Sequence, residues 1–400
     1  MADEIEKPVM SAHAFPASTE DYRQLARRRL PRFLFDYVEG GATDEQSLAA
    51  NVADWRNVSL RQRVSIDVDQ IDTRTTLAGQ ACAMPLALAP VGLAGMLARR
   101  GEVQAARAAA ALTVPFTLST VGICSVQEVQ AATPQTPCWF QLYMLRDRGA
   151  VRAILDKAWA NGSRTLLFTV DLPLPGMRHR DTRNGLTATG LSPALGRLRQ
   201  VLCRPHWLWH VALRGQPLLF GSLSEQVPGA RDLNAFKTWV DSQFDPGVTW
   251  VDIQWLRDLW PGTLIIKGIL DAEDACQAVR IGAQGLVVSN HGGRQLDGVC
   301  STARKLPEIA QAVGADCEIL VDGGIRSGTD MFRALALGAR GVLIGRPWAW
   351  ALAAGGESAV HTLLSSWQRE LQLVMTFAGV TRIAAIGPSH LDRVAAAAAP

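Results

Sequence analysis

Short apolar runs recur along most of the chain, and each ends in a polar residue or a glycine. The runs occupy residues 85–90, 115–120, 138–143, 165–171, 264–269, 285–290, 318–323 and 341–346. They do not alternate between apolar and polar positions, as a strand with one solvated face does. The runs therefore predict strands that are buried on both faces, as in a parallel sheet.

Stretches with helical character separate these runs, for example residues 101–112, 148–160, 271–281 and 328–337. Six of the seven intervals between the starts of consecutive runs span 21 to 33 residues, enough for one strand and one helix. Eight such units predict an α/β protein with a (β/α)₈ TIM barrel. A doubly wound open sheet is the rival, but no Gly-x-Gly-x-x-Gly motif follows the first strand.

Two segments lie outside this repeat. Residues 18–60 predict an N-terminal helical segment whose first helix begins after Ser18. Residues 172–245 are a long insertion after the fourth strand, and its part between 197 and 214 mixes arginine with leucine and tryptophan. That mixture suits either a lid on the barrel or a segment that docks on a membrane surface. We expect residues 1–400 to form one barrel domain.

Composition excludes several classes of protein. Hydrophobic residues make up 48% and charged residues 19% of the 400 residues, so the chain is too apolar to be disordered. A formal net charge of +3 predicts no broad basic surface for nucleic acid. The acidic start predicts no signal peptide, and no apolar run has the roughly 20 residues of a spanning helix. Seven cysteines without a Cys-x-x-Cys pair suit a reducing, intracellular compartment.

Polar side chains gather where the predicted strands end, which is where barrels of this class carry their chemistry. These positions include Pro90, Ser119, Gln141, Tyr143, Thr169, Asp171, Lys267, Ser289, His291, Asp322 and Arg346. Residues that only terminate strands would be interchangeable small ones. A set that combines Gln, Tyr, Asp, Lys, His and Arg predicts an active site at this end of the barrel.

Two glycine–arginine groups follow the last two strands. They are Gly323-Gly324 with Arg326, and Gly345 with Arg346. Barrels often bind phosphate at this place through backbone N–H groups and a helix N-terminus. The pattern predicts a phosphate-bearing cofactor or substrate, and two ordinary turns are the alternative.

His291 is the candidate general base, because a neutral imidazole accepts protons at physiological pH. Asp171, at the end of another strand, would orient the ring and stabilise its cation. A metal site would need more ligands than these two residues provide, so we expect none.

Arg178 and Arg294 belong to loops at the same end of the barrel, where Tyr37 and Tyr143 would also lie. Two guanidinium groups with phenol hydroxyls predict a receptor for a small carboxylate. Lys267 leaves two alternatives open: a Schiff-base nucleophile, as in barrel aldolases, or a fixed cation that stabilises a developing anion. A barrel without catalytic activity that docks on membranes is a further alternative.

Residues 289–298 read Ser-Asn-His-Gly-Gly-Arg-Gln-Leu-Asp-Gly. This run resembles the active-site signature of the FMN-dependent L-2-hydroxy acid dehydrogenases and oxidases, and the resemblance extends from about residue 21 to about residue 391. Within that family the chain is similar to the bacterial quinone-dependent L-lactate dehydrogenases. Residues 86–93, 98–106, 116–121 and 267–271 carry that finer likeness.

The resemblance implies a role for each candidate on the substrate side. His291 would take a proton from the substrate, and Asp171 would support the resulting cation. Tyr143 would hydrogen-bond the substrate hydroxyl or the developing carbonyl. The carboxylate would be held by Tyr37, Arg178 and Arg294.

On the cofactor side, the resemblance implies that FMN is bound and that Lys267 stabilises its reduced ring, which disfavours the Schiff base. The implied FMN contacts are Pro90, Val91, Gly92, Ser119, Gln141, Thr169, Lys267, Ser289, Asp322, Gly323, Gly324, Arg326, Gly345 and Arg346.

The activity implied by the resemblance is oxidation of a small 2-hydroxy acid, L-lactate to pyruvate, with electrons passing through FMN to the membrane quinone pool. The alternative is L-mandelate dehydrogenation, or an oxidase reaction that uses oxygen. Val121, in place of a larger residue found in plant glycolate oxidases, favours lactate over glycolate. The resemblance also implies a homo-oligomer, a tetramer, that is peripheral on the cytoplasmic face of the inner membrane or cytoplasmic.

Overall fold

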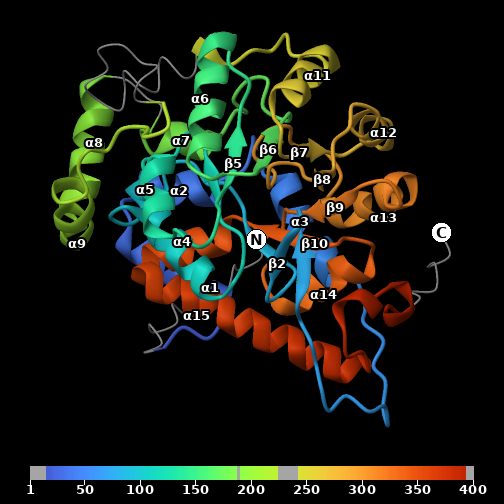
Figure 1. Cartoon of the computed structure of the whole chain (residues 1–400). Helices are drawn as coiled ribbons and strands as arrows, with labels where there is room; N and C mark the ends of the chain where they lie inside the picture. Colours follow the sequence, from blue (N-terminus) through green and yellow to red (C-terminus); the bar gives the residue numbers. More distant parts are fainter. Residues whose placement is uncertain (1–14, 187–189, 224–241, 393–400) are drawn as a thin grey trace, which may run out of the picture.

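Eight parallel strands close into a barrel in the computed structural model, which describes residues 15–186, 190–223 and 242–392. The strands are β3 (Leu86–Leu88), β4 (Thr117–Ser119), β5 (Trp139–Leu142), β6 (Thr165–Thr169), β7 (Thr263–Ile269), β8 (Gly285–Val288), β9 (Glu318–Val321) and β10 (Gly341–Ile344). Their order is β3-β10-β9-β8-β7-β6-β5-β4, and a parallel bridge between Leu88 and Phe116 joins the two outer strands (Figure 1). The predicted TIM barrel is confirmed.

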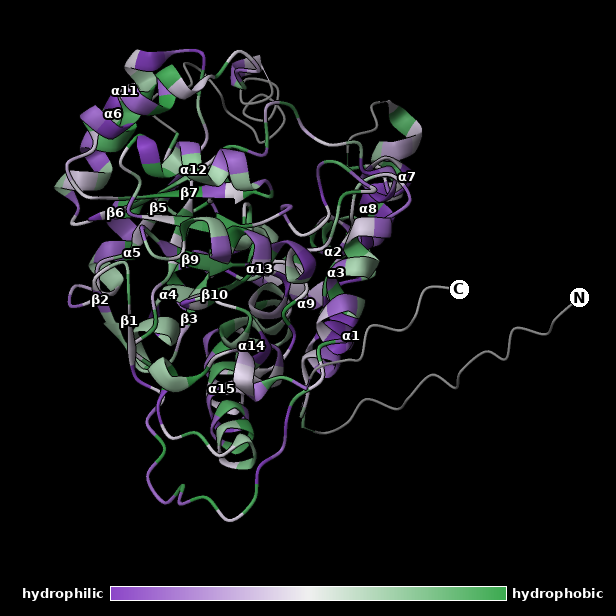
Figure 2. Cartoon of the chain, turned by 90° about the vertical axis from the view of Figure 1, so that its right-hand side faces the viewer, coloured by the Kyte–Doolittle hydropathy of each residue, from purple (hydrophilic) through white to green (hydrophobic). Residues whose placement is uncertain are grey.

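Apolar side chains fill the barrel on both sides of its wall. One buried cluster inside the barrel takes a residue from most of the strands, among them Trp139, Leu167, Ile265, Leu320 and Leu343. The opposite faces of the same strands pack under the surrounding helices, and the strands in Figure 2 are correspondingly apolar. Burial on both faces explains why the strands read as continuous apolar runs.

A short hairpin that the sequence did not predict covers the barrel where the strands begin. It consists of β1 (Thr75–Leu77) and β2 (Gln80–Cys82), joined by Ala78 and Gly79 at φ values of 49° and 76°. Leu77 is fully buried in the cluster inside the barrel. Gln80 accepts a hydrogen bond from the indole of Trp139 at 3.1 Å. The opposite end of the barrel is therefore the one that is left for a ligand.

Helices surround the barrel at the predicted places. They are α4 (Gly101–Ala111), α5 (Val126–Ala132), α6 (Arg148–Ala160), α11 (Trp250–Leu259), α12 (Ala272–Arg280), α13 (Thr302–Val313), α14 (Gly328–Ala336) and α15 (Arg346–Ala378), with short 3₁₀ turns η1 (Ala94–Met96), η3 (Ile383–Ala385) and η4 (Pro388–His390). Asp271 caps α12 by accepting the N–H of Glu273 at 2.8 Å. Gly282 and Gly338 follow helix ends at φ values of 82° and 108°, which glycine adopts without strain.

Three helices precede the barrel: α1 (Thr19–Arg29), α2 (Arg32–Glu39) and α3 (Gln46–Arg56). The predicted start of α1 is confirmed, because Ser18 and Asp21 form a reciprocal capping box. Helix α2 ends at the ligand side of the barrel, and α3 packs against α13 and the loops after β8 and β9. These helices are therefore part of the wall of the site.

The described part of the insertion contains α7 (His179–Arg183), α8 (Leu191–Leu202), α9 (Pro205–Trp207) and the π-helical turn η2 (Leu208–Leu213). Residues 187–189 and 224–241 of the predicted insertion lie outside the described residues. Helix α8 lies at the periphery of the molecule (Figure 1), and none of its residues is buried. Across the described ranges, no helix has the length and apolar character needed to cross a membrane.

Candidate active site

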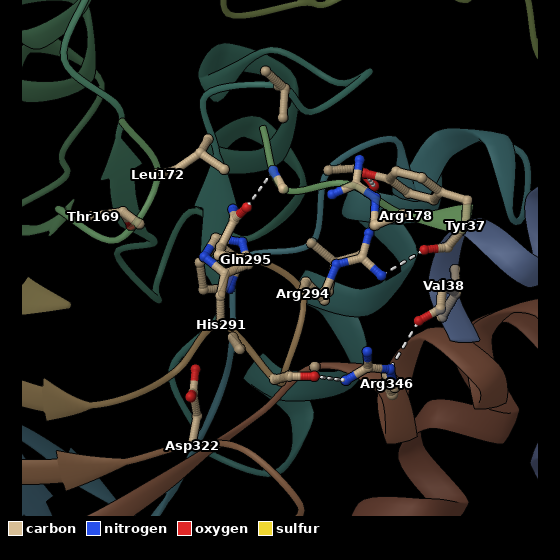
Figure 3. A pocket seen from close by; sticks show the side chains of 18 of the residues that line it. Tyr37, Val38, Thr169, Leu172, Arg178, His291, Arg294, Gln295, Asp322 and Arg346 are labelled. Carbon is tan, nitrogen blue, oxygen red and sulfur yellow. Dashed lines mark hydrogen bonds between the residues drawn. The ribbon is translucent and has the colours of Figure 1, made fainter. Parts of the chain in front are cut away.

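A cavity of about 450 Å³ opens at the carboxyl ends of the barrel strands (Figure 3). The predicted site residues line it, except for four that lie behind its wall. Those that line it are Tyr37, Pro90, Val91, Gly92, Tyr143, Thr169, Arg178, Lys267, His291, Arg294, Asp322, Gly323, Gly324, Arg326, Gly345 and Arg346. The four behind it are Ser119, Gln141, Asp171 and Ser289. Residues from the N-terminal helices, every part of the barrel and the insertion thus meet in one place.

Three of the residues behind the wall fix those in front of it. The Ser119 hydroxyl donates a hydrogen bond to the side-chain oxygen Oε1 of Gln141 at 3.1 Å. The Gln141 side-chain nitrogen Nε2 in turn donates to the Thr169 hydroxyl at 3.2 Å. The Ser289 hydroxyl accepts a hydrogen bond from the Lys267 ammonium at 2.9 Å. Because these polar groups are buried and satisfied by one another, they hold the side chains at the cavity surface in defined positions.

His291 is held by Asp171, the fourth residue behind the wall. Its Nδ1 lies 2.7 Å from Asp171 Oδ1. A carboxylate accepts, so Nδ1 carries the proton of the neutral ring and Nε2 keeps a free lone pair. His291 itself adopts a left-handed φ of 56°, an uncommon conformation for a non-glycine residue.

The electrostatic environment keeps the His291 ring neutral. Burial lowers the pKa of His291; Asp171 raises it in part, while Lys267 and Arg294 lower it further, so that it lies below its ordinary value. Burial alone would raise the pKa of Asp171, but His291 and Lys267 hold it below its usual range. These shifts favour a neutral imidazole beside a carboxylate anion, an arrangement that can accept a proton.

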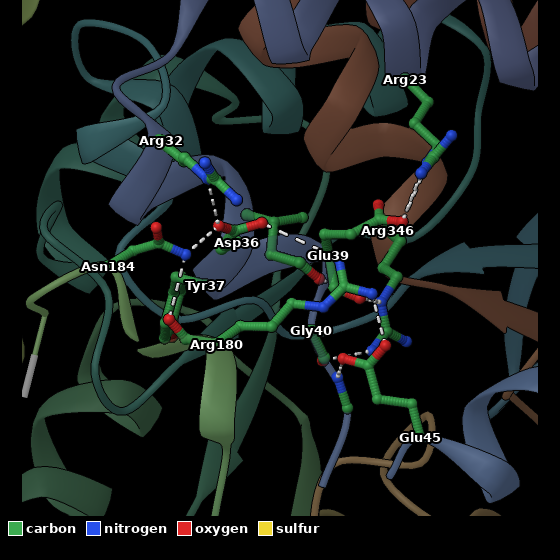
Figure 4. Close-up of polar contacts among 12 residues, drawn as sticks. Arg23, Arg32, Asp36, Tyr37, Glu39, Gly40, Glu45, Arg180, Asn184 and Arg346 are labelled. Atoms are coloured by element: carbon green, nitrogen blue, oxygen red, sulfur yellow. Dashed lines mark hydrogen bonds and ion pairs between the residues drawn. The ribbon is translucent and has the colours of Figure 1, made fainter. Parts of the chain in front are cut away.

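Two half-buried arginines are oriented by the C-terminal end of α2. Arg294 donates to the carbonyl oxygens of Tyr37 at 2.7 Å and Gly40 at 2.8 Å. Arg346 donates to the carbonyls of Val38 at 2.9 Å and Gly40 at 2.8 Å (Figures 3 and 4). The last carbonyls of a helix lack partners within it and carry its negative dipole end. Helix α2 thus positions both guanidinium groups.

Three half-buried guanidinium groups, those of Arg294, Arg326 and Arg346, line the same cavity. Burial lowers the pKa of Arg326 to about 10, although Glu39 and Asp330 raise it. Burial, and then the charges of Arg294 and Arg326, hold the pKa of Arg346 well below its ordinary value. An anionic ligand would relieve this repulsion, which supports the predicted phosphate site.

An unsatisfied polar atom in the cavity wall adds to the description of the ligand. Asp322 Oδ1 is buried and has no hydrogen-bond partner among the described residues. Asp322 Oδ2 meanwhile lies 3.1 Å from the Lys267 ammonium. Since buried polar groups are normally paired, a ligand with hydroxyl groups as well as a phosphate fits this part of the cavity.

Arg178 joins Arg294 on the opposite side of the cavity from Asp322 (Figure 3). Its Nε donates to Asp181 at 2.7 Å. The Arg294 guanidinium lies over the Tyr37 ring, 5.2 Å from its centroid. The structure thus brings together the two guanidinium groups and the phenol for which the sequence predicts carboxylate binding.

Helix α3 supports the loop that carries His291, which sequence reasoning missed. Asn51 and Asn290 exchange side-chain amide hydrogen bonds of 2.7 and 2.9 Å, and both are buried. The Trp55 indole donates to Gly323 at 2.8 Å. Asp297 accepts the Ser47 N–H at 2.8 Å at the start of the helix. The signature and the glycine pair mark the barrel side of these contacts, but no motif marks their α3 partners Ser47, Asn51 and Trp55.

We predict that Asn51→Leu lowers the free energy of unfolding by about 1–3 kcal/mol, because the buried Asn290 amide loses its partner. Denaturant unfolding of the purified protein measures this loss. Gln46→Ala, at an exposed position of the same helix, is the control and should change it by less than about 0.5 kcal/mol. Equal losses in both variants would contradict a supporting role for the amide pair.

Comparison with known proteins agrees with this geometry. The family model for FMN-dependent dehydrogenases matches residues 26–393. The chain is 54% identical over 375 residues to an L-lactate dehydrogenase of Caulobacter vibrioides, covering 94% of this chain and 97% of that one. It is 50% identical over 380 residues to an L-lactate dehydrogenase of Pseudomonas syringae pv. syringae, covering 95% and 99%.

Solved structures give the same result. A monotopic membrane protein, (S)-mandelate dehydrogenase, superposes with a TM-score of 0.88 at 33% identity, over 94% of this chain and 99% of that one. A mandelate oxidase in complex with (S)-4-hydroxymandelic acid superposes with a TM-score of 0.81 at 36% identity, over 94% and 98%. The family match over residues 26–393 and the identity to these relatives lead to one conclusion: the chain belongs to the family of FMN-dependent dehydrogenases.

Proposed function

We propose that this enzyme oxidises L-lactate to pyruvate with FMN as its cofactor and quinone as its electron acceptor. The observation that carries the proposal is the cavity in which the His291–Asp171 pair meets two guanidinium groups beside a phosphate-type site. The L-lactate dehydrogenases at 50–54% identity support this choice of substrate.

FMN supplies the electron acceptor that protein side chains lack. The residues present fit it, since Lys267 and several arginines line the cavity and Asp322 Oδ1 has no hydrogen-bond partner within the described ranges. The backbone around Gly323 and Gly324 and the Arg326 guanidinium would hold its phosphate. Asp322 would accept hydrogen bonds from the ribityl hydroxyls of FMN, and Lys267 would face the flavin ring. The remaining predicted contacts are Pro90, Val91, Gly92, Ser119, Gln141, Thr169, Ser289, Gly345 and Arg346.

The chain's own groups handle the proton that leaves the substrate. Arg178 and Arg294 hold the carboxylate, with Tyr37 beside them, so that the substrate carbinol faces His291. His291 Nε2 accepts the proton, and Asp171 stabilises the imidazolium that results. Burial raises the pKa of Tyr143 far above its ordinary value, so its hydroxyl remains a hydrogen-bond donor toward the substrate oxygen.

Helix α8 offers a surface for the proposed membrane contact. Leu191, Leu195, Leu198 and Leu202 are spaced four, three and four residues apart and are 85%, 66%, 53% and 61% exposed. This spacing places them on one face of the helix. Trp209 and Leu213 of η2 are also exposed, and the Arg214 guanidinium lies 4.5 Å from the Trp209 ring.

An exposed apolar stripe with tryptophan and arginine is typical of a helix that lies in a membrane interface. The (S)-mandelate dehydrogenase that superposes on this chain is described as a monotopic membrane protein. We therefore propose that the enzyme docks peripherally, on the cytoplasmic face of the inner membrane where quinone is accessible. The family resemblance further supports residues 1–400 as one barrel domain and a homotetramer as the assembly.

The first prediction tests the function directly. Purified holoprotein should show a flavin absorption band that L-lactate bleaches and D-lactate leaves unchanged, because the carboxylate receptor and the base fix one enantiomer. Stopped-flow absorbance measures the reduction, and subsequent mixing with a soluble quinone or with oxygen measures reoxidation. Faster reoxidation by oxygen than by quinone would contradict a dehydrogenase, and bleaching only by L-mandelate would contradict the lactate assignment.

A second prediction concerns pH. With His291 neutral as the base, the rate of flavin reduction should rise with pH through a pKa below about 6.5 and then level off. Asp171 raises the pKa of His291, so Asp171→Asn should move this inflection to lower pH. The plateau rate should fall on the order of 100-fold, because the imidazolium loses its counterion.

The pH–rate profile under single-turnover conditions checks this expectation. Asp258→Asn, on helix α11, serves as a control that leaves both the inflection and the plateau in place. An inflection that moves to higher pH in Asp171→Asn would show that Asp171 does not stabilise protonated His291.

A third prediction concerns the membrane. Leu195→Glu combined with Leu198→Glu should reduce binding to vesicles that contain anionic lipid at least about tenfold. Two leucine side chains that would contact the lipid become negatively charged in this variant. Co-sedimentation measures the bound fraction. Leu373→Glu is the matched control, since Leu373 on α15 is 51% exposed against 53% for Leu198. Equal binding of wild type and the double variant would contradict docking through α8.

A further inference from the structure

The described parts of the insertion return to the barrel at two points beside the cavity. Gly221 donates its N–H to the carbonyl of Gly122, in the loop after β4, at 3.0 Å. Phe244 forms an antiparallel bridge with Leu145, in the loop after β5. Backbone pairing thus attaches the insertion to the barrel at both places.

Each attachment places a phenyl ring in the wall of the cavity. Phe220 is 5% exposed and Phe244 is 6% exposed, and both line the cavity. The Phe244 ring meets the Tyr143 ring edge-on, with centroids 5.6 Å apart and planes at 77°. The Tyr143 ring in turn stacks beside His291 at 6.5 Å.

An ion-pair cluster holds the Phe244 segment rigidly. The Arg148 guanidinium lies 2.8 Å from both Asp245 and Asp252. Arg146 donates its N–H to Gln243 at 2.9 Å, so the residues on both sides of Phe244 are fixed. These contacts hold the backbone on both sides of the Phe244 ring against the barrel.

The cavity wall contains apolar as well as polar side chains. The carboxylate and carbinol of a 2-hydroxy acid are matched by the arginines and His291. The substituent on its carbinol carbon is left with the apolar wall, formed by Val121, Leu172, Phe220 and Phe244.

The cavity also has little space to spare. Pockets for a single drug-sized ligand measure about 300–1,000 Å³. Here about 450 Å³ must accommodate both the cofactor and the substrate. An aryl or long alkyl substituent would compete with the two phenyl rings for this space.

We propose that Phe220 and Phe244 determine substrate size, and that they restrict the enzyme to L-2-hydroxy acids with a short alkyl substituent. This inference rests on the proposed function, which it deepens. The insertion that presents leucines outward on α8 thus supplies the substrate-selecting wall inward.

The experiment compares kcat/KM for L-lactate, L-2-hydroxyhexanoate and L-mandelate in the holoenzyme. Phe244→Ala and Phe220→Ala should each raise the ratio of the larger acids to L-lactate at least about tenfold, as expected for an apolar pocket that gains several carbon volumes. Phe377→Ala, at a 59% exposed position of α15, is the control and should keep the wild-type ratio. A ratio unchanged in both cavity variants would overturn the inference.

Two further measurements keep the outcomes distinct. Phe244→Leu retains most of the packing and should shift the ratio in the same direction by a smaller factor, so a misfolded alanine variant does not remove the test. Failure of all three acids to bleach the wild-type flavin would count against the proposed function itself. Bleaching by L-lactate with unchanged ratios in every variant would count against the size-limiting role alone.

Discussion

The rest of the site depends on positive charge that is concentrated at one end of the barrel, partly withdrawn from water. Buried Lys267 and half-buried Arg294, Arg326 and Arg346 converge there, and the Lys267 ammonium lies 3.1 Å from the Asp322 carboxylate. Unpaired buried charge is costly. The fold lowers this cost with the carbonyl end of α2 and leaves the remainder to an anionic cofactor. Cofactor binding and folding stability are therefore coupled, since a ligand that binds only the native state stabilises it.

Much of the fold and the centre of the site could be predicted from the sequence, because both follow from local patterns. Strands buried on both faces must be apolar throughout, so the apolar runs predicted all eight barrel strands. Parallel strands bring their carboxyl ends to one edge, so residues as distant as Asp171 and His291 could be placed together before any coordinates. The 2.7 Å contact between them agrees with that placement.

Other parts could not be predicted, because they depend on where the chain returns after irregular segments. The Arg346 guanidinium, at a position predicted as a phosphate contact, also binds carbonyl oxygens at the end of α2 and that of Gly292. The Asn51–Asn290 pair joins residues 239 positions apart. The signature marks Asn290 and Gly292 but not their partners in α2 and α3, because those contacts arise from the docking of the two helices on the barrel. The position of Phe220 and Phe244 in the cavity wall could not be predicted for the same reason.

The insertion carries the exposed leucines of α8 on its outside and the cavity-lining phenylalanines on its inside, and several contacts join it to the barrel. The Trp207 indole, 5% exposed, donates to the carbonyl of Met96 at 2.7 Å and joins α9 to the barrel. Gly221 and Phe244 make the other two attachments. A helix tethered through rigid contacts transmits its orientation to the body it is tethered to. Docking through α8 would therefore orient the barrel on the membrane, so one segment would determine both where electrons leave and which acids enter.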